Sequence, residues 1–209
     1  QLGGQALNLY KTATGDEIQP KLSGLIEEIQ KNNNIHLHLD TRLSKVEGFV
    51  GNFEATLSNN GSKETLDFGI AVMATGAAPL KPDEYHYGDD PRILSSLELD
   101  RKFIDRDPGL KKLQTAVFIQ CVGSREPHRP YCSRVCCTHS IDNALQLKKL
   151  NPDMNIIILY RDIRTYGERE YLYKEARAAG VIFMRFSPDN KPEVVLEDGK
   201  VLVNTHDPI

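Results

Sequence analysis

The first third of the chain combines one helical pattern of hydrophobic residues with several alternating patterns. Leu22, Leu25, Ile26 and Ile29 follow the i, i+3, i+4, i+7 spacing of an amphipathic helix, which we expect over 21–31. Hydrophobic and polar residues alternate in four later segments, and these predict strands over 35–39, 43–49, 53–57 and 64–68. Turn residues separate them, so the strands should form an antiparallel meander. The apolar run 69–74 is typical of a buried strand.

The second half of the chain alternates between strand and helix patterns. We expect strands over 115–120, 155–160 and 181–185, and helices over 133–150 and 168–179. Strand–helix–strand–helix–strand at this spacing indicates a parallel βαβαβ unit. The segments 191–196 and 200–204 flank Asp198-Gly199 and should form a closing hairpin.

Prolines punctuate the region between these two halves, where we expect a connector with one short helix over 95–103. The predicted organisation is therefore a first region 1–80 with the β-meander, a connector 81–112, and an α/β domain 113–209. The first residue is Gln rather than Met, and we interpret the chain as an internal piece of a longer protein.

Composition and charge add only broad limits. The 209 residues are 40% hydrophobic and 26% charged, which is ordinary for a globular protein. A net charge of −3 gives no reason to expect a nucleic-acid partner or an anionic membrane surface. The longest apolar runs are strand-length, far below the roughly 18 residues of a membrane span, and no secretory signal is visible. We therefore expect a cytoplasmic protein without a membrane span.

The strongest chemical signal is the clustering of all four cysteines, Cys121, Cys132, Cys136 and Cys137, within one short segment. Cys121 follows the first strand of the βαβ unit, at the sheet edge where such folds bind ligands. If the helix begins at Ser133, the other three thiols lie at its start. The four thiols would then converge beside a helix amino end, whose positive dipole favours an anionic thiolate cluster.

Thiolate ligands select iron–sulfur clusters or zinc. The spacing lacks the paired CxxC knuckles of structural zinc sites, so an iron–sulfur cluster is the best candidate. Zinc, a redox-active thiol pair or disulfide, and four unconnected buried thiols remain the alternatives. His128 and His139 could replace a ligand, and Arg125, Arg129 and Arg134 add positive charge nearby, as their positions in the chain indicate.

Three further segments are weaker candidates. Val122-Gly123-Ser124 occupies the place of a glycine-rich dinucleotide turn, but the G-x-G-x-x-G pattern is broken there, so a plain turn is favoured. The polar loop 160–166 is expected to be solvated. Gly3-Gly4 and Ala74-Thr75-Gly76 could allow a close backbone approach to a ligand or could be simple turns.

At these motifs the sequence resembles the A subunit of heterodisulfide reductase, over essentially the whole chain. The most specific resemblance lies in Phe118-Ile-Gln-Cys-Val-Gly-Ser-Arg125 followed by Tyr131-Cys-Ser-Arg-Val-Cys-Cys137. Weaker similarities lie in Leu2-Gly-Gly-Gln-Ala6, Val50-Gly-Asn-Phe-Glu54, Tyr160-Arg-Asp-Ile-Arg164 and Gly180-Val-Ile-Phe183.

The resemblance implies a two-dinucleotide-binding flavoprotein architecture of the thioredoxin-reductase-like class. In it, a partial FAD-binding domain with a β-meander precedes a Rossmann-like domain. It further implies that the four cysteines hold a [4Fe–4S] cluster where relatives of that class bind NADPH. FAD would lie against Gly3, Gly4, Ala74, Thr75 and Gly76. The implied role is electron transfer between flavin and cluster in electron bifurcation, without a catalytic acid or base.

The implied partners are other subunits of a heterodisulfide-reductase-like complex and an electron-donating hydrogenase or dehydrogenase. Several family segments are absent from this chain, among them the G-x-G-x-x-G strand and the CxxCxxC clusters, so the isolated piece is expected to be inactive. Two other functions stay open. One is a fragment of an NAD(P)H-dependent pyridine nucleotide–disulfide oxidoreductase, and the other is a zinc-stapled assembly domain.

Overall fold

The structure of the chain, a computed structural model, describes residues 1–206. The last three residues of the predicted α/β domain, 207–209, lie outside the described residues. The chain forms two compact units, and each contains a short N-terminal segment and a longer later one. The first unit consists of Gln1–Leu7 and Ile18–Ala78, and the second of Asn8–Glu17 and the residues from Pro79 onward.

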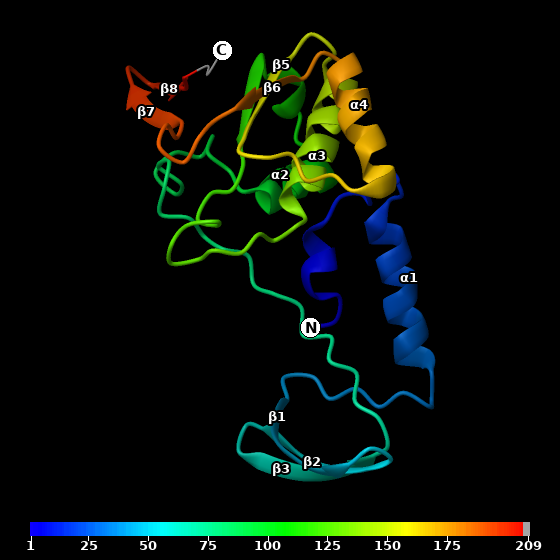
Figure 1. Cartoon of the computed structure of the whole chain (residues 1–209). Coiled ribbons are helices and arrows are strands. Elements are labelled where there is room, and N and C mark those ends of the chain that lie inside the picture. The colour runs from blue at the N-terminus through cyan, green and yellow to red at the C-terminus, as the bar shows by residue number, and fades with distance from the viewer. Residues whose placement is uncertain (207–209) are drawn as a thin grey trace. The chain divides into compact units, whose positions relative to one another are not determined.

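The first unit contains one helix and one antiparallel sheet (Figure 1). After a short 3₁₀ helix, η1 (Gly4–Asn8), the elements are α1 (Ile18–Lys31), β1 (Arg42–Phe49), β2 (Asn52–Asn59) and β3 (Ser62–Phe68). The strands pair in the order β1-β2-β3, with Ala55 of β2 buried between its neighbours. Gly51 and Gly61 make the two turns at φ +89° and +90°, a conformation that favours glycine. The predicted helix and meander are confirmed.

Two predicted strands of the first unit are wrong. Residues 35–39 and 69–74 have no regular secondary structure, and no strand in the described part of the chain pairs with either. In the second segment, Ile70 is 78% exposed and Val72 is 85% exposed. An apolar strand needs neighbours to satisfy its backbone and cover its side chains, and local sequence cannot show whether such neighbours exist.

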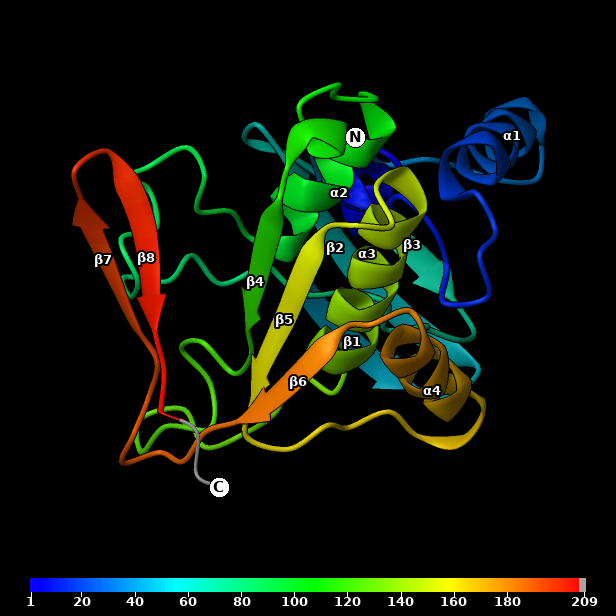
Figure 2. The ribbon, with the colours of Figure 1, turned by 90° about the horizontal axis from the view of Figure 1, so that it is seen from above.

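The second unit contains the predicted parallel sheet. Its strands are β4 (Thr115–Ile119), β5 (Asn155–Tyr160) and β6 (Ile182–Arg185), in the order β4-β5-β6. The crossover helices are α3 (Cys136–Leu150) and α4 (Glu170–Ala178), and Figure 2 shows both on one face of the sheet. The remaining elements of this unit are α2 (Ser96–Ile104), η2 (Leu110–Lys112), η3 (Gly167–Arg169), β7 (Glu193–Glu197) and β8 (Lys200–Asn204). The βαβαβ unit and the closing hairpin are confirmed, and the chain is of mixed α/β class.

The core of the second unit lies between the sheet and helix α3. Ile156 and Ile158 of β5 and Ile141 of α3 are fully buried. Because β5 is the central strand, its side chains are covered by both neighbouring strands and by the helix. This packing fixes the carboxyl ends of the strands. Two loops emerge there, the cysteine-bearing loop 120–135 after β4 and the polar loop 160–166 after β5.

Helix α2 begins with a complete capping box. Ser95 Oγ accepts a hydrogen bond from Glu98 N at 3.3 Å, and Glu98 Oε2 accepts one from Ser95 N at 2.7 Å. The S-x-x-E pattern therefore satisfies two backbone donors at once. We expect Ser95→Ala to lower the free energy of unfolding of this unit by about 1 kcal/mol, measured by urea denaturation. Ser96→Ala is the control, and an equal loss in both variants would contradict the role of the cap.

Helix α3 begins three residues later than predicted, at Cys136 rather than Ser133. Arg134 has φ +63°, a left-handed conformation that a right-handed helix cannot contain. The chain therefore turns before the helix starts, and Cys132 lies on the preceding loop. The prediction that Cys132 lies at the start of this helix, together with Cys136 and Cys137, is wrong for this reason.

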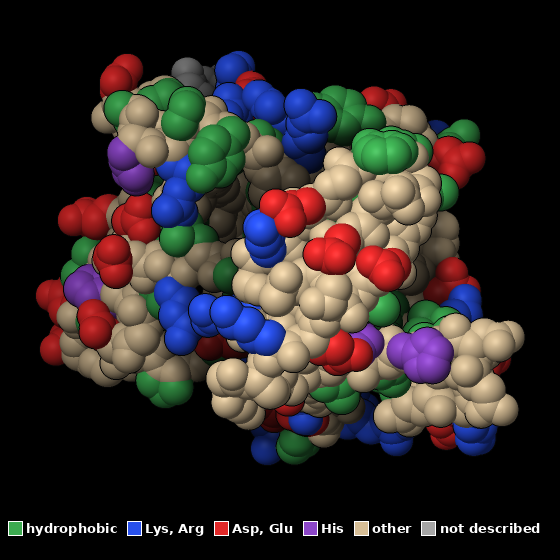
Figure 3. Space-filling view, turned by 90° about the horizontal axis from the view of Figure 1, so that it is seen from below, with side chains coloured by type: hydrophobic (Ala, Val, Ile, Leu, Met, Phe, Trp, Pro, Cys, Tyr) green, Lys and Arg blue, Asp and Glu red, His purple; other side chains and the backbone are tan. Residues whose placement is uncertain are grey.

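The molecular surface mixes side-chain types. On the face shown in Figure 3, acidic and basic side chains are interspersed with hydrophobic ones. Among the described residues, no helix is both long enough and apolar enough to span a lipid bilayer.

Candidate metal centre

The four cysteines come from three structural elements of the second unit. Cys121 follows the last residues of β4, where it is buried with φ +62°. Cys132 lies on the loop that follows, and Cys136 and Cys137 are the first two residues of α3. All four thiols are free. One strand end, one loop and one helix start therefore each contribute to the same edge of the parallel sheet.

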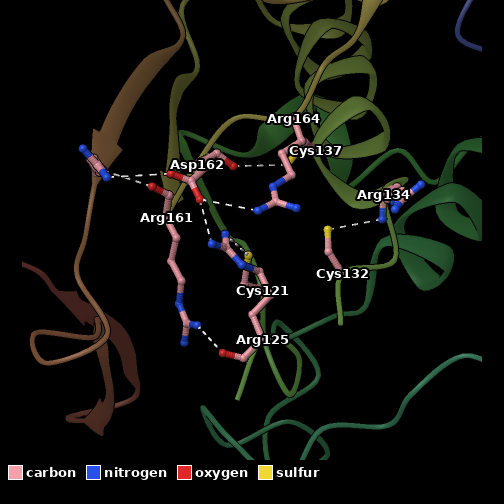
Figure 4. A network of polar contacts seen from close by, with 9 residues as sticks. Cys121, Arg125, Cys132, Arg134, Cys137, Arg161, Asp162 and Arg164 are labelled. Carbon is pink, nitrogen blue, oxygen red and sulfur yellow. Dashed lines mark hydrogen bonds and ion pairs between the residues drawn. The ribbon is translucent and has the colours of Figure 1, made fainter. Parts of the chain in front are cut away.

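The thiols of Cys121 and Cys137 contact two residues, Arg125 and Asp162, that are bound to each other (Figure 4). Arg125 donates from NH1 toward Cys121 Sγ at 3.9 Å and from NH2 to Asp162 Oδ2 at 2.7 Å. The Cys137 thiol donates to the backbone carbonyl oxygen of Asp162 at 3.7 Å. The strand-end cysteine and a helix-start cysteine are thus connected through Arg125 and Asp162.

The adjacent thiols at the helix start interact directly. The neighbouring Cys137 side chain lowers the pKa of Cys136 to about 6, with a further contribution from the Ser133 hydroxyl. The same pairing raises the pKa of Cys137. Burial raises the pKa of Cys121, and the negative charge of Cys136 adds to that rise. Cys121, Cys136 and Cys137 are therefore close enough to affect one another's ionisation.

Cys132 is held by the backbone of its own loop. Its Sγ accepts a hydrogen bond from the Arg134 N–H at 3.3 Å, and this contact depends on the left-handed turn at Arg134 (Figure 4). Within the described residues, no three Cys, His, Asp or Glu side chains are placed as ligands of a single metal ion. The structure therefore brings Cys121, Cys136 and Cys137 within reach of one another and leaves Cys132 in contact with its own loop.

The surroundings suit an anionic thiolate cluster. Val135, the N-cap of α3, offers no side-chain hydrogen bond to the helix, so the first N–H groups and the positive end of the dipole are not neutralised by a capping side chain. Of the two histidines considered as ligands, His139 binds the buried carboxylate of Asp100, with Nε2 at 2.9 Å from Oδ1. His128 is exposed on the loop. Chemically, four free thiols with a helix dipole and arginines fit an iron–sulfur cluster.

A second charged network, which sequence reasoning missed, fastens the cysteine-bearing loop to the end of β5. Arg161 is buried and binds both the Arg125 carbonyl oxygen, at 2.8 Å, and the Glu126 carboxylate. Lys191 reaches the same carboxylate at 2.9 Å. These residues lie up to 65 positions apart, so no local pattern indicates the contact.

The loop 160–166 is less solvated than expected. Arg161 and Thr165 are buried, although Tyr166 is 60% exposed. The loop borders an open hollow of about 990 Å³ between the end of β5 and the start of α4, with Tyr171 and Lys174 on its far side. Its burial follows from the contacts of Arg161, which hold the loop against the protein.

The broken glycine motif forms a turn that is covered by protein. Gly123 has φ +59°, and a Cβ at this position would overlap the side chain of Leu80. Arg129 also binds the Gly123 carbonyl oxygen, with NH1 at 3.3 Å. The turn requires glycine both for its backbone conformation and for the close approach of Leu80.

The candidate FAD residues lie in the first unit. Gly3 and Gly4 have positive φ angles at the start of η1, and Ala74, Thr75 and Gly76 form an exposed irregular segment. Gln5 Nε2 donates to the Ala77 carbonyl oxygen at 3.3 Å, so the two glycine-containing segments lie next to each other. A ligand that touches one of them could therefore reach the other.

No protein-family model matches the chain. Several curated proteins are nevertheless clearly similar to it. The A subunit of a CoB–CoM heterodisulfide reductase from Methanopyrus kandleri, named as an iron–sulfur subunit, is 35% identical over 63% of this chain and 22% of its own length. The homologue from Methanocaldococcus jannaschii is 34% identical over 64% of this chain and 22% of its length. This chain is homologous to part of the A subunit of heterodisulfide reductase.

The similarity covers about three-fifths of the chain, less than the near-complete match that the motifs suggested. The chain spans about a fifth of the length of the heterodisulfide reductase subunits that it matches. Another relative, from Methanothermobacter thermautotrophicus, is the A subunit of an H(2):CoB-CoM heterodisulfide,ferredoxin reductase, 33% identical over 64% of this chain and 22% of its own length. These relatives are therefore named as reductase subunits, and the Methanopyrus protein is named as an iron–sulfur subunit.

Proposed function

We propose that the chain is an electron-transfer segment of an FAD- and iron–sulfur-dependent oxidoreductase related to the A subunit of heterodisulfide reductase. The observation that carries this proposal is that the free thiols of Cys121, Cys136 and Cys137 interact at the carboxyl edge of the parallel sheet, next to an uncapped helix start, with the free thiol of Cys132 on the loop between them. We infer that Cys121, Cys132, Cys136 and Cys137 hold one [4Fe–4S] cluster. Such a cluster, when bound, supplies reversible one-electron chemistry.

The residues of the chain would bind and tune the cluster rather than take part in acid–base chemistry. Cys121 is held at the strand end, and Cys136 and Cys137 are fixed by the first turn of α3. The N–H groups at the start of α3 and the guanidinium groups of nearby arginines would stabilise the negative charge of the thiolates. Burial of Cys121 and Cys137 keeps water away from their sulfur atoms.

The fold supports a Rossmann-like assignment for the second unit. Its parallel strands carry crossover helices on one face, as in a dinucleotide-binding domain, where the nucleotide lies at the carboxyl ends of the strands. The loop after β4 and the start of α3, which carry the cysteines, lie at the corresponding end. Leu80 and Arg129 occupy the surroundings of the turn at Gly123. We infer that the cluster takes the place of NADPH, so electrons pass through this unit without a nicotinamide.

For the first unit, we propose that it is part of an FAD-binding domain. Gly3, Gly4, Ala74, Thr75 and Gly76 would lie against the flavin nucleotide, because the two segments are neighbours and their backbones are accessible. In the complete protein, electrons would pass between FAD and the cluster in electron bifurcation. The partners we propose are the other subunits of a heterodisulfide-reductase-like complex and an electron-donating hydrogenase or dehydrogenase.

A redox titration of the anaerobically reconstituted chain tests this function. The chain is poised with dithionite and mediator dyes, and electron paramagnetic resonance (EPR) spectra are recorded in both directions. We expect one reversible one-electron wave, with a signal from the reduced cluster. A metal-loaded chain that shows no reversible wave, and whose fold melts when a chelator removes the metal, would instead identify a zinc-stapled assembly domain.

A further inference from the structure

The contacts of Arg125 indicate a role in the cysteine site beyond charge alone. Resting on the cluster proposed above, we propose that Arg125 is a positioning residue of the metal centre: anchored by Asp162, its guanidinium holds Cys121 at the end of β4 and sets the reduction potential of the cluster. Among the described residues, no other arginine guanidinium donates a hydrogen bond to a cysteine sulfur. Arg125 would thus be a further functional residue of the cysteine site.

The Arg125 guanidinium connects the loop after β4 with the loop after β5, which are distant in the sequence. One of its nitrogens lies 3.9 Å from Cys121 Sγ, after β4, and another lies 2.7 Å from Asp162 Oδ2, after β5. While it is protonated, the Cys137 thiol at the start of α3 donates to the carbonyl oxygen of the same Asp162, 3.7 Å away. A cluster-bound thiolate has no proton for this contact. A flat, forked donor can contact a sulfur and a carboxylate at once in fixed geometry, whereas a lysine ammonium acts as a single flexible point charge.

The position of Arg125 is itself fixed by its backbone. Arg125 has φ +59°, a conformation that is unfavourable for a non-glycine residue and persists only where surrounding contacts hold it. Its N–H donates to the Tyr131 carbonyl oxygen at 3.3 Å, and its own carbonyl oxygen accepts from Arg161 at 2.8 Å. Glu126 in turn holds Arg161. The loop is therefore fastened on both sides of the residue that faces the thiol.

The anchoring carboxylate is also surrounded by positive charge. Besides Arg125, Asp162 faces Arg164 at 3.8 Å and Arg185 at 3.7 Å. The Arg125 side chain is 22% exposed, and that of Asp162 is 43% exposed. Because Arg125 is the less exposed partner and points to Cys121, its charge acts on the thiolate with little screening. A cationic hydrogen-bond donor at a cluster sulfur favours the reduced, more negative state and raises the reduction potential.

The test compares Arg125→Gln and Arg125→Lys with the wild-type chain after anaerobic cluster reconstitution. Arg101→Gln is the matched control, because Arg101 forms a similar ion pair with Asp105 at 3.0 Å on helix α2, away from the cysteine-bearing loop. The readouts are the midpoint potential, the EPR spectrum of the reduced cluster and the rate of iron release to a chelator. Circular dichroism checks that each variant is folded.

We expect Arg125→Gln to shift the midpoint potential to more negative values, to change the EPR spectrum and to release iron about tenfold faster. Arg125→Lys should lie between it and wild type, because the charge remains but the fork is lost. Asp162→Asn should speed iron release in the wild-type background and add little in the Arg125→Gln background, since both act through one contact. Arg101→Gln should match wild type.

Retention of the wild-type potential and EPR spectrum in Arg125→Gln would overturn the proposal, even with faster iron loss, because the residue would then be only structural. If Arg125→Gln holds no iron, the same comparison is decided by Arg125→Lys, for which wild-type values would overturn it. A wild-type chain that forms no iron–sulfur cluster would instead refute the proposed function itself. The two failures are therefore distinguishable.

Discussion

Serine in place of Cys136 is expected to prevent cluster assembly. Cys136 begins α3 and carries the thiol whose pKa is lowered to about 6 by the neighbouring Cys137 side chain, so it readily forms a thiolate. Serine retains the size of the side chain but not the sulfur ligand. We expect iron to fall from about four atoms per chain to less than about one, with loss of absorbance near 400 nm. Iron analysis after anaerobic reconstitution measures the effect.

The control for this substitution lies on the loop between β4 and α3. Ser124→Ala changes a residue between the cysteines that supplies no sulfur ligand, and it should leave the iron content unchanged. Cys121→Ser, Cys132→Ser and Cys137→Ser should behave like Cys136→Ser. Cys132 is the most informative of these, because its sulfur is held by the Arg134 N–H of its own loop rather than by another thiol. Full iron content in Cys132→Ser would remove it from the ligand set.

Truncation of Ile158 to alanine is expected to be the most destabilising change outside the cysteine site. Ile158 is fully buried in the central strand β5, where it lies opposite Phe118 of β4 and Phe183 of β6. Alanine would leave a cavity that the surrounding strands and helix cannot fill, at a cost of about 3 kcal/mol in the free energy of unfolding. Urea denaturation of the iron-free chain, followed by circular dichroism, measures this without a contribution from bound metal.

A matched control is available on the neighbouring strand. Ile182 begins β6 and is 51% exposed, so Ile182→Ala removes the same atoms from a site that is already half in water. We expect it to cost less than about 1 kcal/mol. Equal losses in the two variants would contradict the assignment of β5 as the buried centre of the sheet.

Local patterns were sufficient to predict most elements of the fold. The helix at 18–31, the meander, the parallel unit and the closing hairpin all carry periodicity or turn residues that can be read along the chain. The wrong predictions are segments whose state depends on distant neighbours. The run 69–74 is apolar enough for a buried strand, but no described strand pairs with it. The start of α3 was misplaced because the left-handed turn at Arg134 has no sequence signal.

The candidate metal centre was only partly predictable. The clustering of the cysteines and the strand-end position of Cys121 followed from the sequence, because one motif carries them all. The Arg125–Asp162 pair joins residues 37 positions apart, and the Arg161–Glu126 pair joins residues 35 apart. Such contacts arise from the parallel arrangement of β4 and β5, which brings the loops after both strands to the same edge. Only the folded sheet reveals them.

Metal and sulfide analysis of the wild-type chain is the most direct test of the proposed iron–sulfur centre. The chain is prepared and reconstituted without oxygen, so that the free thiols are not oxidised. We expect about four iron and four acid-labile sulfide per chain, with a brown colour. A colourless protein that contains one zinc per chain and no sulfide would contradict the proposed centre.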